Sequence, residues 1–446
     1  MNITRGLVCC AICFLAIHHG ASAQQKETWT LQDCLGYALA NNISIKKSAN
    51  QIAISKENAK QSKAALLPSL SASTSQSIGY RPWMSGNTST VTNGQVTSGV
   101  KKEYYAGSYG VSGNWTVWNG NKNHNTLKLN KLYEEEAKLD SAISAKSIQE
   151  QIMQLYVQLL YLKEAIEVNK SSVANSMANE ERGKVMLEVG KLSKVDVAQL
   201  TAQTAQDQYN LVEAQTNFEK YNLQLKQVLE LPDTMHFEVQ EPLTDDSKAL
   251  QPLPVLQDIY STALALRPEI KKAENSISEQ ETNIKIAKAG YYPTLSMSAG
   301  VSTNTSSRDN FAWQRQMKTN FDMMAGLSVS IPIYDQRQAK TATNKAKYEW
   351  MNSKLDLEQR KKDLYNTIEN YWLDATSNQQ LFKASIANVN SKQESYNLLE
   401  QQFQLGLKNI IELTTEKVNL LQAQQAKLQS KYLTILNIEL LQFYAQ

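Results

Sequence analysis

The sequence is poor in cysteine, histidine and proline, and it contains no long apolar segment. Its 446 residues include four cysteines, four histidines and nine prolines. Three of the cysteines lie within the first 13 residues, so Cys34 is the only one in the rest of the chain and an intrachain disulfide is excluded there. After residue 23 no stretch of about 18 apolar residues occurs, so no transmembrane helix is expected.

Charge is nearly balanced, and motifs for catalysis or ligand binding are lacking. The 46 Lys and Arg residues against 43 Asp and Glu argue against nucleic acid as the main partner, because nucleic-acid binding needs a clustered basic surface. Beyond residue 25 the histidines are His124 and His236, which with Cys34 give no metal-ligand spacing. Neither a G-x-x-x-x-G-K-[ST] nor a G-x-S-x-G motif occurs. We therefore expect no enzyme, no cofactor and no metal site.

The amino terminus has the features of an export signal. Arg5 supplies the positive start, residues 6–17 form a short apolar run, and residues 21–23 give an A-x-A cleavage site. The run of about 12 residues is too short for a spanning helix. We expect residues 1–23 to be a cleaved signal peptide, without a lipid anchor, and the protein to be exported.

The most informative feature present is a large internal repeat. Residues 31–74 align without a gap with residues 256–299, and 19 of the 44 positions are identical. The later parts of the two copies align at an offset of 216 instead of 225, which matches Gly190 with Gly406 and leaves nine extra residues in the first copy. A repeat of this size determines the architecture. We expect a first repeat at residues 24–231, a connector at 232–255 and a second repeat at 256–446.

Each repeat predicts one long helix beside two shorter helices stacked end to end. Residues 121–189 hold no proline and one glycine, and their apolar residues follow a coiled-coil spacing. At about 1.5 Å per residue such a helix runs on the order of 100 Å. The expected helices are 31–66, 121–189 and 195–231 in the first copy and 256–291, 336–405 and the carboxyl-terminal segment after residue 409 in the second.

After the proline that ends the first helix of each copy, the sequence period changes to two. Four segments alternate apolar with small polar residues, namely 69–80, 105–117, 295–303 and 323–333. This alternation, with aromatic residues near the segment ends, is typical of outer-membrane β-strands. The polar segments 81–103 and 304–321 are expected to be exposed hairpin loops.

Four strands in one chain require further copies. An open strand edge in lipid leaves unpaired backbone groups that cost several kcal/mol each, and known membrane barrels begin at about eight strands. The chain is therefore expected to form a homo-oligomeric barrel continued by a helical tube. Two, three or four copies all satisfy this argument.

The ordered set of motifs resembles the TolC-like outer-membrane efflux protein family. It consists of the Leu-Gln-Asp opening, the strand starts at Pro68 and Pro293, and the turns at Gly190 and Gly406, each present twice in the same order. The resemblance implies an α+β membrane protein, a trimer with four transmembrane strands per chain. Its 12-stranded β-barrel lies in the outer membrane of a Gram-negative-type bacterium, and its coiled-coil helical tunnel crosses the periplasm. It also implies three kinds of partner, which are outer-membrane lipid, a periplasmic adaptor protein, and an inner-membrane pump or ABC transporter.

The resemblance further implies a constriction at the far tip of the tunnel, after the second glycine turn. Family members narrow there at acidic rings, and Glu412 stands six residues after Gly406. Thr415 occupies the place of a second acid, so one ring is expected instead of two. Lys408 and Phe403 take the basic and aromatic positions that help to hold the tip shut.

The first glycine turn is followed by a candidate residue equivalent to Glu412. Asp196, six residues after Gly190, corresponds to the family's partner in inter-helix locking contacts. For both Asp196 and Glu412 an alternative stays open, namely that each is an acid stabilised by the positive end of its own helix. The turns at Gly190 and Gly406 are the expected docking points for the adaptor.

These expectations predict the exit duct of a tripartite efflux system, which passes substrates passively while the pump supplies energy. A ring of carboxylates at a narrow mouth would favour cations. Two other functions remain open, the outer-membrane component of type I protein secretion and a non-channel periplasmic coiled-coil scaffold. An adaptor-like scaffold would need additional domains for which the short alternating segments leave no room. The sequence does not specify the cargo, because the small polar strand face is generic.

Overall fold

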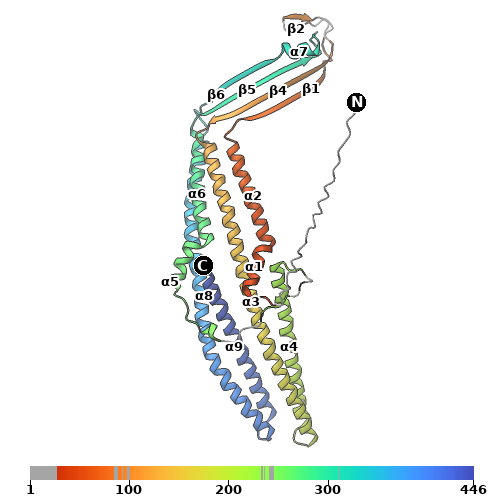
Figure 1. Cartoon of the computed structure of the whole chain (residues 1–446), viewed down its shortest axis with the longest axis vertical. Helices are drawn as coiled ribbons and strands as arrows, with labels where there is room; N and C mark the ends of the chain where they lie inside the picture. Colours follow the sequence, from red (N-terminus) through yellow and green to blue (C-terminus); the bar gives the residue numbers. More distant parts are fainter. Residues whose placement is uncertain are drawn as a thin grey trace, which may run out of the picture.

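The computed structural model describes residues 28–84, 89–92, 94–97, 101–232, 235, 237–240, 246–309 and 311–446. The molecule is elongated, with long helices at one end and a four-stranded sheet at the other (Figure 1). Within those ranges no helix has an apolar stretch that could span a bilayer. The signal peptide expected at residues 1–23 lies outside the described residues.

The two repeats follow the same order of elements. The first contains α1 (Leu31–Asn41), α2 (Ile43–Ala64), β1 (Ser69–Tyr80), β4 (Glu103–Trp118), α3 (Lys122–Glu188) and α4 (Lys194–Leu229). The second contains α5 (Leu256–Leu266), α6 (Pro268–Lys288), β5 (Thr294–Ser306), β6 (Asp322–Ser330), α8 (Gln338–Gln404) and α9 (Ile410–Tyr444). The minor elements are β2 (Thr90–Thr92), β3 (Gln95–Thr97), η1 (Asp246–Leu250), η2 (Ala289–Tyr291) and α7 (Trp313–Thr319).

The expectation of a single first helix in each repeat was wrong. Asn42 leaves the helical region with ψ 131°, and its side chain accepts from the N–H of Ser44 to start α2. Its amide also donates to the carbonyl of Val228 at 2.9 Å, so a distant contact stabilises the break. In the second copy Arg267 is extended because the residue before Pro268 is excluded from the helical region.

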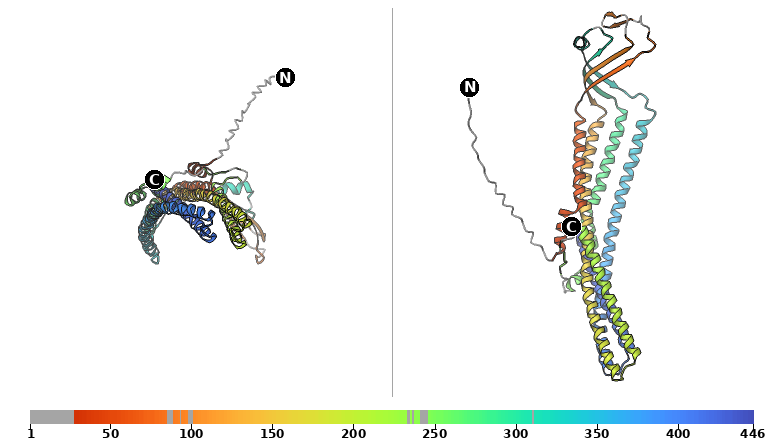
Figure 2. Two further views of the ribbon diagram at one scale, coloured as in Figure 1. Left: turned by 90° about the horizontal axis from the view of Figure 1, so that it is seen from below. Right: turned by 90° about the vertical axis from the view of Figure 1, so that its right-hand side faces the viewer.

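The long helices confirm the expected stacking. α3 and α8 have 67 residues each, and each runs beside two shorter helices in line, α2 and α4 for the first and α6 and α9 for the second. The coiled-coil positions Ile152 and Leu159 of α3 are fully buried against Leu225 and Leu229 of α4. Each such side chain stabilises the pair by about 1.5–3 kcal/mol. Seen along the molecule, the helices form an arc (Figure 2).

The four main strands form one antiparallel sheet in the order β1-β4-β5-β6, so β4 and β5 join the repeats. The register gathers the apolar residues of all four strands on one face, as in the row Ala72, Val111, Val301 and Met323. The next row, Ser73, Gly110, Ser302 and Asp322, belongs to the opposite face. We call this opposite side the serine face. The alternation predicted from the sequence is thus confirmed, except that β6 ends at Ser330, so the expected residues 331–333 lie outside it, where Pro332 cannot donate to a sheet.

Two segments expected to be loops carry short elements of their own. The first contains the small β2–β3 hairpin. The second contains α7, which is attached to the apolar face of β5, because the hydroxyl of Thr303 donates to the carbonyl of Met317 at 2.9 Å. The ring of Trp313 lies against Tyr109 of β4 at 6.2 Å between centroids. Both elements lie at the end of the sheet that is remote from the helices (Figure 1).

Candidate functional site

The two long helices end in equivalent turns that lie together at the end of the molecule far from the sheet (Figure 1). Gly190 has φ +73° and Gly406 φ +77°, a left-handed conformation that glycine adopts without a Cβ penalty. In each turn the N–H after the glycine donates to a carbonyl of the preceding helix, at 2.8 and 2.9 Å. No atom lies within 4 Å of a Cβ placed at either glycine, so backbone conformation, not space, requires glycine here.

The structure brings Glu412 and Lys408 together at the second tip. The ammonium Nζ of Lys408 lies 2.6 Å from Oε2 of Glu412, and their side chains are 38% and 42% exposed. The N–H of Glu412 donates to the side chain of Asn409, the N-cap of α9, at 2.8 Å. An exposed pair at this helical spacing contributes about 0.3–0.5 kcal/mol, so it partly neutralises the carboxylate without fixing it rigidly.

Asp196 occupies the equivalent place at the start of α4 and forms a capping box with Ser193. Its carboxylate accepts from the N–H and the hydroxyl of Ser193 at 2.9 and 2.7 Å, and the Ser193 hydroxyl accepts from the N–H of Asp196 at 3.2 Å. The bonds from Ser193 lower the pKa of Asp196, and the bond from its backbone N–H has the larger effect. The local role named as the alternative for Asp196 is therefore present in the described structure, and its locking role stays a prediction.

Phe403 is a packing residue between the two hairpins. It is 3% exposed and belongs to an apolar cluster with Leu200 of α4, Tyr396 of α8, and Ile410 and Leu413 of α9. Because Leu200 comes from the first repeat and the others from the second, this cluster joins the two tips. Loss of such a contact would weaken the packing of one hairpin against the other.

A buried ion pair further from the tips also joins the two repeats, and the sequence analysis missed it. Lys417 of α9 is 6% exposed and Asp207 of α4 only 1%. The Lys417 ammonium contacts the carboxylate of Asp207 and the hydroxyl of Ser176 on α3, and it donates to the carbonyl of Ser172 at 2.9 Å. We call these four residues the Lys417 cluster. Burial lowers the pKa of Lys417, and the Asp207 carboxylate opposes that change.

A sequence signal for this cluster did exist. Leu413, Lys417 and Leu420 lie at coiled-coil spacing, so the lysine interrupts the apolar seam of α9. Two further contacts lie between the cluster and the tips. Asn179 donates to the hydroxyl of Tyr396 at 3.2 Å, and Arg182 pairs with Glu400 at 3.0 Å. The hairpins are therefore held together at several levels.

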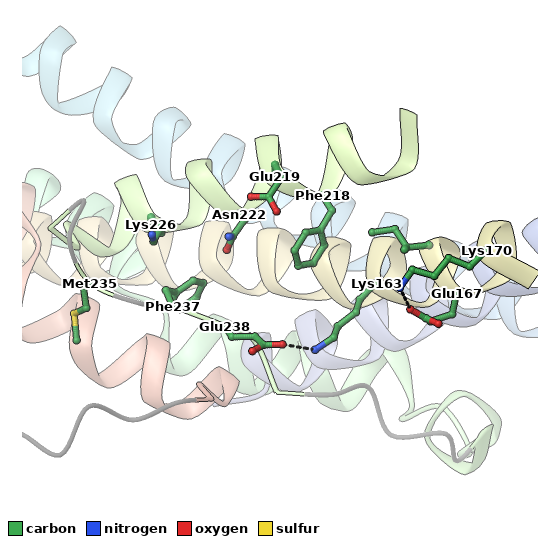
Figure 3. A pocket seen from close by; sticks show the side chains of 11 residues that line it. Lys163, Glu167, Lys170, Phe218, Glu219, Asn222, Lys226, Met235, Phe237 and Glu238 are labelled. Carbon is green, nitrogen blue, oxygen red and sulfur yellow. Dashed lines mark hydrogen bonds and ion pairs between the residues drawn. The ribbon is translucent and has the colours of Figure 1, made fainter. Parts of the chain in front are cut away.

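A cavity of about 620 Å³ lies between α3, α4 and the segment around Phe237 (Figure 3). Two of its lysines are already paired, Lys163 with Glu238 at 3.0 Å and Lys170 with Glu167 at 2.7 Å. Lys226 and Glu219 also line it, so charges of both signs are present and the cavity indicates no particular ligand chemistry.

Comparisons with known proteins agree with this architecture. The family model described as "Outer membrane efflux protein" matches residues 34–230 and 259–442. TolC of Escherichia coli K12 is 23% identical over 257 residues, which are 56% of this chain and 51% of that protein. The chain thus spans about half the length of TolC in that alignment. Toxin and drug export protein A of Aggregatibacter actinomycetemcomitans is 21% identical over 398 residues, covering 89% of this chain and 81% of that protein.

Solved structures share the fold over nearly the whole chain. A crystal structure of CusC superposes with a TM-score of 0.77 at 16% identity, covering 93% of this chain and 91% of that one. The outer membrane protein VceC of Vibrio cholerae gives a TM-score of 0.75 at 15% identity, covering 92% and 95%. These likenesses confirm the helical-tunnel fold with strands expected from the sequence. The matched model also confirms the expected outer-membrane location, and the chain belongs to the outer membrane efflux protein family.

Proposed function

We propose that three copies of this chain form a channel that serves as the exit duct of a tripartite efflux system. The observation that carries the proposal is the four-stranded sheet, apolar on one face and lined by serine and glycine on the other. Its outer strands β1 and β6 each have one edge without a partner in the described part of the chain. In lipid such edges must pair, and neighbouring copies are the available partners.

Three-fold closure fits the count of strands and the curvature of the helices. Three sheets of four strands would make a 12-stranded barrel, within the range of known membrane barrels. The apolar faces would meet lipid and the serine faces would line a wet lumen. The arc of helices in one copy would supply one third of a tunnel wall that continues the barrel (Figure 2).

The tips would form the gate. Glu412 of each copy would contribute to one acidic constriction, with Lys408 partly neutralising it and Phe403 holding the hairpins together. The turns at Gly190 and Gly406 would dock a periplasmic adaptor protein, which connects the duct to an inner-membrane pump or ABC transporter. Transport through the duct would be passive, and the pump would set its direction.

One relative supports a second candidate function. The Aggregatibacter protein that aligns over most of this chain is named for export of toxin and drug. The same duct would then also serve as the outer-membrane component of type I protein secretion. The geometry of the duct is the same for both cargoes, so the inner-membrane partner would determine which cargo is exported.

Conductance across planar bilayers tests the proposal. The purified protein is expected to give a small cation-selective conductance, which becomes larger or less selective in Glu412→Ala because a ring of carboxylates is lost. Glu57→Ala removes an exposed carboxylate from α2, far from the tips, and serves as the control. Assembled protein that never conducts would contradict the channel and favour a scaffold role. Conductance unaffected by Glu412→Ala would contradict the gate alone.

A further inference from the structure

The serine face ends, at the outer end of the sheet, in a group of cations around one tyrosine. The N–H of Arg81 donates to the carbonyl of Lys102 at 3.0 Å, which continues the β1–β4 register by one pair beyond Tyr80 and Glu103. Because side chains alternate along a strand, Arg81 and Lys102 point to the same face as Gly79 and Tyr104, the serine face. We call Arg81, Lys102, Tyr104 and Arg308 the collar.

The ring of Tyr104 holds two guanidinium groups of the collar. The Cζ atom of Arg308 lies 3.8 Å from the ring centroid and that of Arg81 5.5 Å from it. The ring itself lies over Gly79, where an added Cβ would overlap it. Gly79 thus leaves room for the ring of Tyr104, and this ring makes cation–π contacts with both arginines.

Within the described residues no ion pair joins the collar to a carboxylate, and Asp309, which follows Arg308, accepts instead from the N–H of Phe311 at 3.0 Å. Nε and Nη2 of Arg308 are buried without a hydrogen-bond partner there, and the ammonium of Lys102 donates only to the carbonyl of Pro82 at 3.2 Å. Residues 82–100 contain no Asp or Glu, and Glu103 alternates to the opposite face. Two nitrogens of this half-buried guanidinium thus lack a partner, which is costly, so the arrangement is suited to an anion that arrives from outside the chain.

We propose that the collar binds organic anions at the outer mouth of the channel. The inference rests on the proposed function, because the serine face becomes a lumen wall only when the copies close into a barrel. Three copies would then place three cations each around the outer mouth, opposite in sign to Glu412 at the tips. The planar guanidinium groups stacked on Tyr104 match flat ligands that bear carboxylate, sulfonate or phosphate groups. Such ligands would be concentrated at the outer mouth.

Block of single channels by a naphthalenetrisulfonate tests the inference. Added on the side of the sheet, this flat trianion is expected to block the parent channel, and added on the side of the tips it is expected to block weakly. Arg81→Gln combined with Arg308→Gln should raise the half-blocking concentration about tenfold or more, because charged hydrogen bonds are lost. Arg308→Lys, which keeps the charge but not the planar fork, should weaken the block by a smaller factor.

Lys101→Gln is the control for general charge at the mouth, because it removes one exposed positive charge adjacent to the collar. An unchanged block in the Arg81→Gln/Arg308→Gln channel, or an equal loss of block in Lys101→Gln, would overturn the collar assignment. The open-channel current of each variant reports separately on the channel itself. If no variant and no parent conducts, the proposed function fails; if all conduct and none differs in block, only this inference fails.

Discussion

The buried carboxyl of Glu279 predicts how stability depends on pH. It lies on α6 with 5% exposure and accepts from the amide of Asn275 at 2.7 Å. Burial, followed by the charge of Glu136 on α3, raises its pKa to about 7. Since the folded pKa exceeds the unfolded one, the contribution to stability is complete at acidic pH and is lost as the pH rises through about 7.

Replacement of Glu279 by glutamine should therefore stabilise the protein above about pH 7, by about 1–3 kcal/mol per chain, with little effect near pH 4, below the unfolded pKa. Thermal unfolding of the detergent-solubilised protein at both pH values measures this. Glu281→Gln, on the exposed side of the same helix, is the control. A stabilisation that is equal at acidic and alkaline pH would contradict a raised pKa for Glu279.

Replacement of glycine by alanine should change stability in opposite directions at the tip and within a helix. At Gly406 a Cβ meets open space, but φ +77° makes alanine unfavourable, by about 1–2 kcal/mol. At Gly36 in α1 a Cβ also meets open space and the backbone is helical, so alanine should stabilise by about 0.5–1 kcal/mol. Melting temperatures of the two variants should move in opposite directions. A melting temperature of Gly406→Ala that is unchanged or raised would show that conformation at the turn is not what requires glycine.

At the scale of elements, patterns confined to a short stretch of sequence predicted the structure well. The alternation of period two predicted residues 69–80, which is the range of β1, and the long helices ended within a few residues of the expected bounds. Pro268 could have predicted the break before α6, since proline restricts the residue before it. The break at Asn42 is harder to foresee, because it is stabilised by the carbonyl of Val228, 186 residues away.

In the candidate site too, side chains set by local sequence could be predicted, and those set by distant contacts could not. Both acids at the tips were found from their distance to a glycine turn, and both lie at helix starts that the turn positions. The Lys417 cluster depends on residues from two other helices, α3 and α4, which are separated from Lys417 by 210 to 245 positions. A polar residue on an apolar seam signals an unusual contact, but it does not name the partner.

The Lys417 cluster should make the packing of α9 on α3 and α4 depend strongly on one charge. Lys417→Met would leave the carboxylate of Asp207 buried and unpaired, which costs about 3–5 kcal/mol. Asp207→Asn would likewise leave the ammonium of Lys417 buried without a counter-charge. The double variant removes both charges and should recover most of the loss. A double-mutant cycle of thermal unfolding measures the coupling, and strictly additive effects would contradict a direct ion pair.

At the scale of the whole molecule, the two open edges of the sheet define how copies would meet. β1 and β6 are the outer strands, and in the order β1-β4-β5-β6 each strand is antiparallel to its neighbours. A β6 edge can therefore accept the β1 edge of the next copy and continue the antiparallel pattern. Contacts of this head-to-tail kind close into a ring only for a particular rotation between copies.

Cysteine cross-linking of these edges should reveal a ring of three. Ser73→Cys on β1 combined with Met324→Cys, Gly326→Cys or Ser328→Cys on β6 scans positions of the serine face. Because Cys34 is buried and is the one cysteine after residue 23, it should contribute little background. Oxidation of the assembled protein at the matching register should give covalent dimers and trimers, whereas either single variant should stay monomeric. A covalent tetramer would replace three-fold by four-fold closure, and the absence of any β1–β6 product would contradict a barrel built by joining these edges.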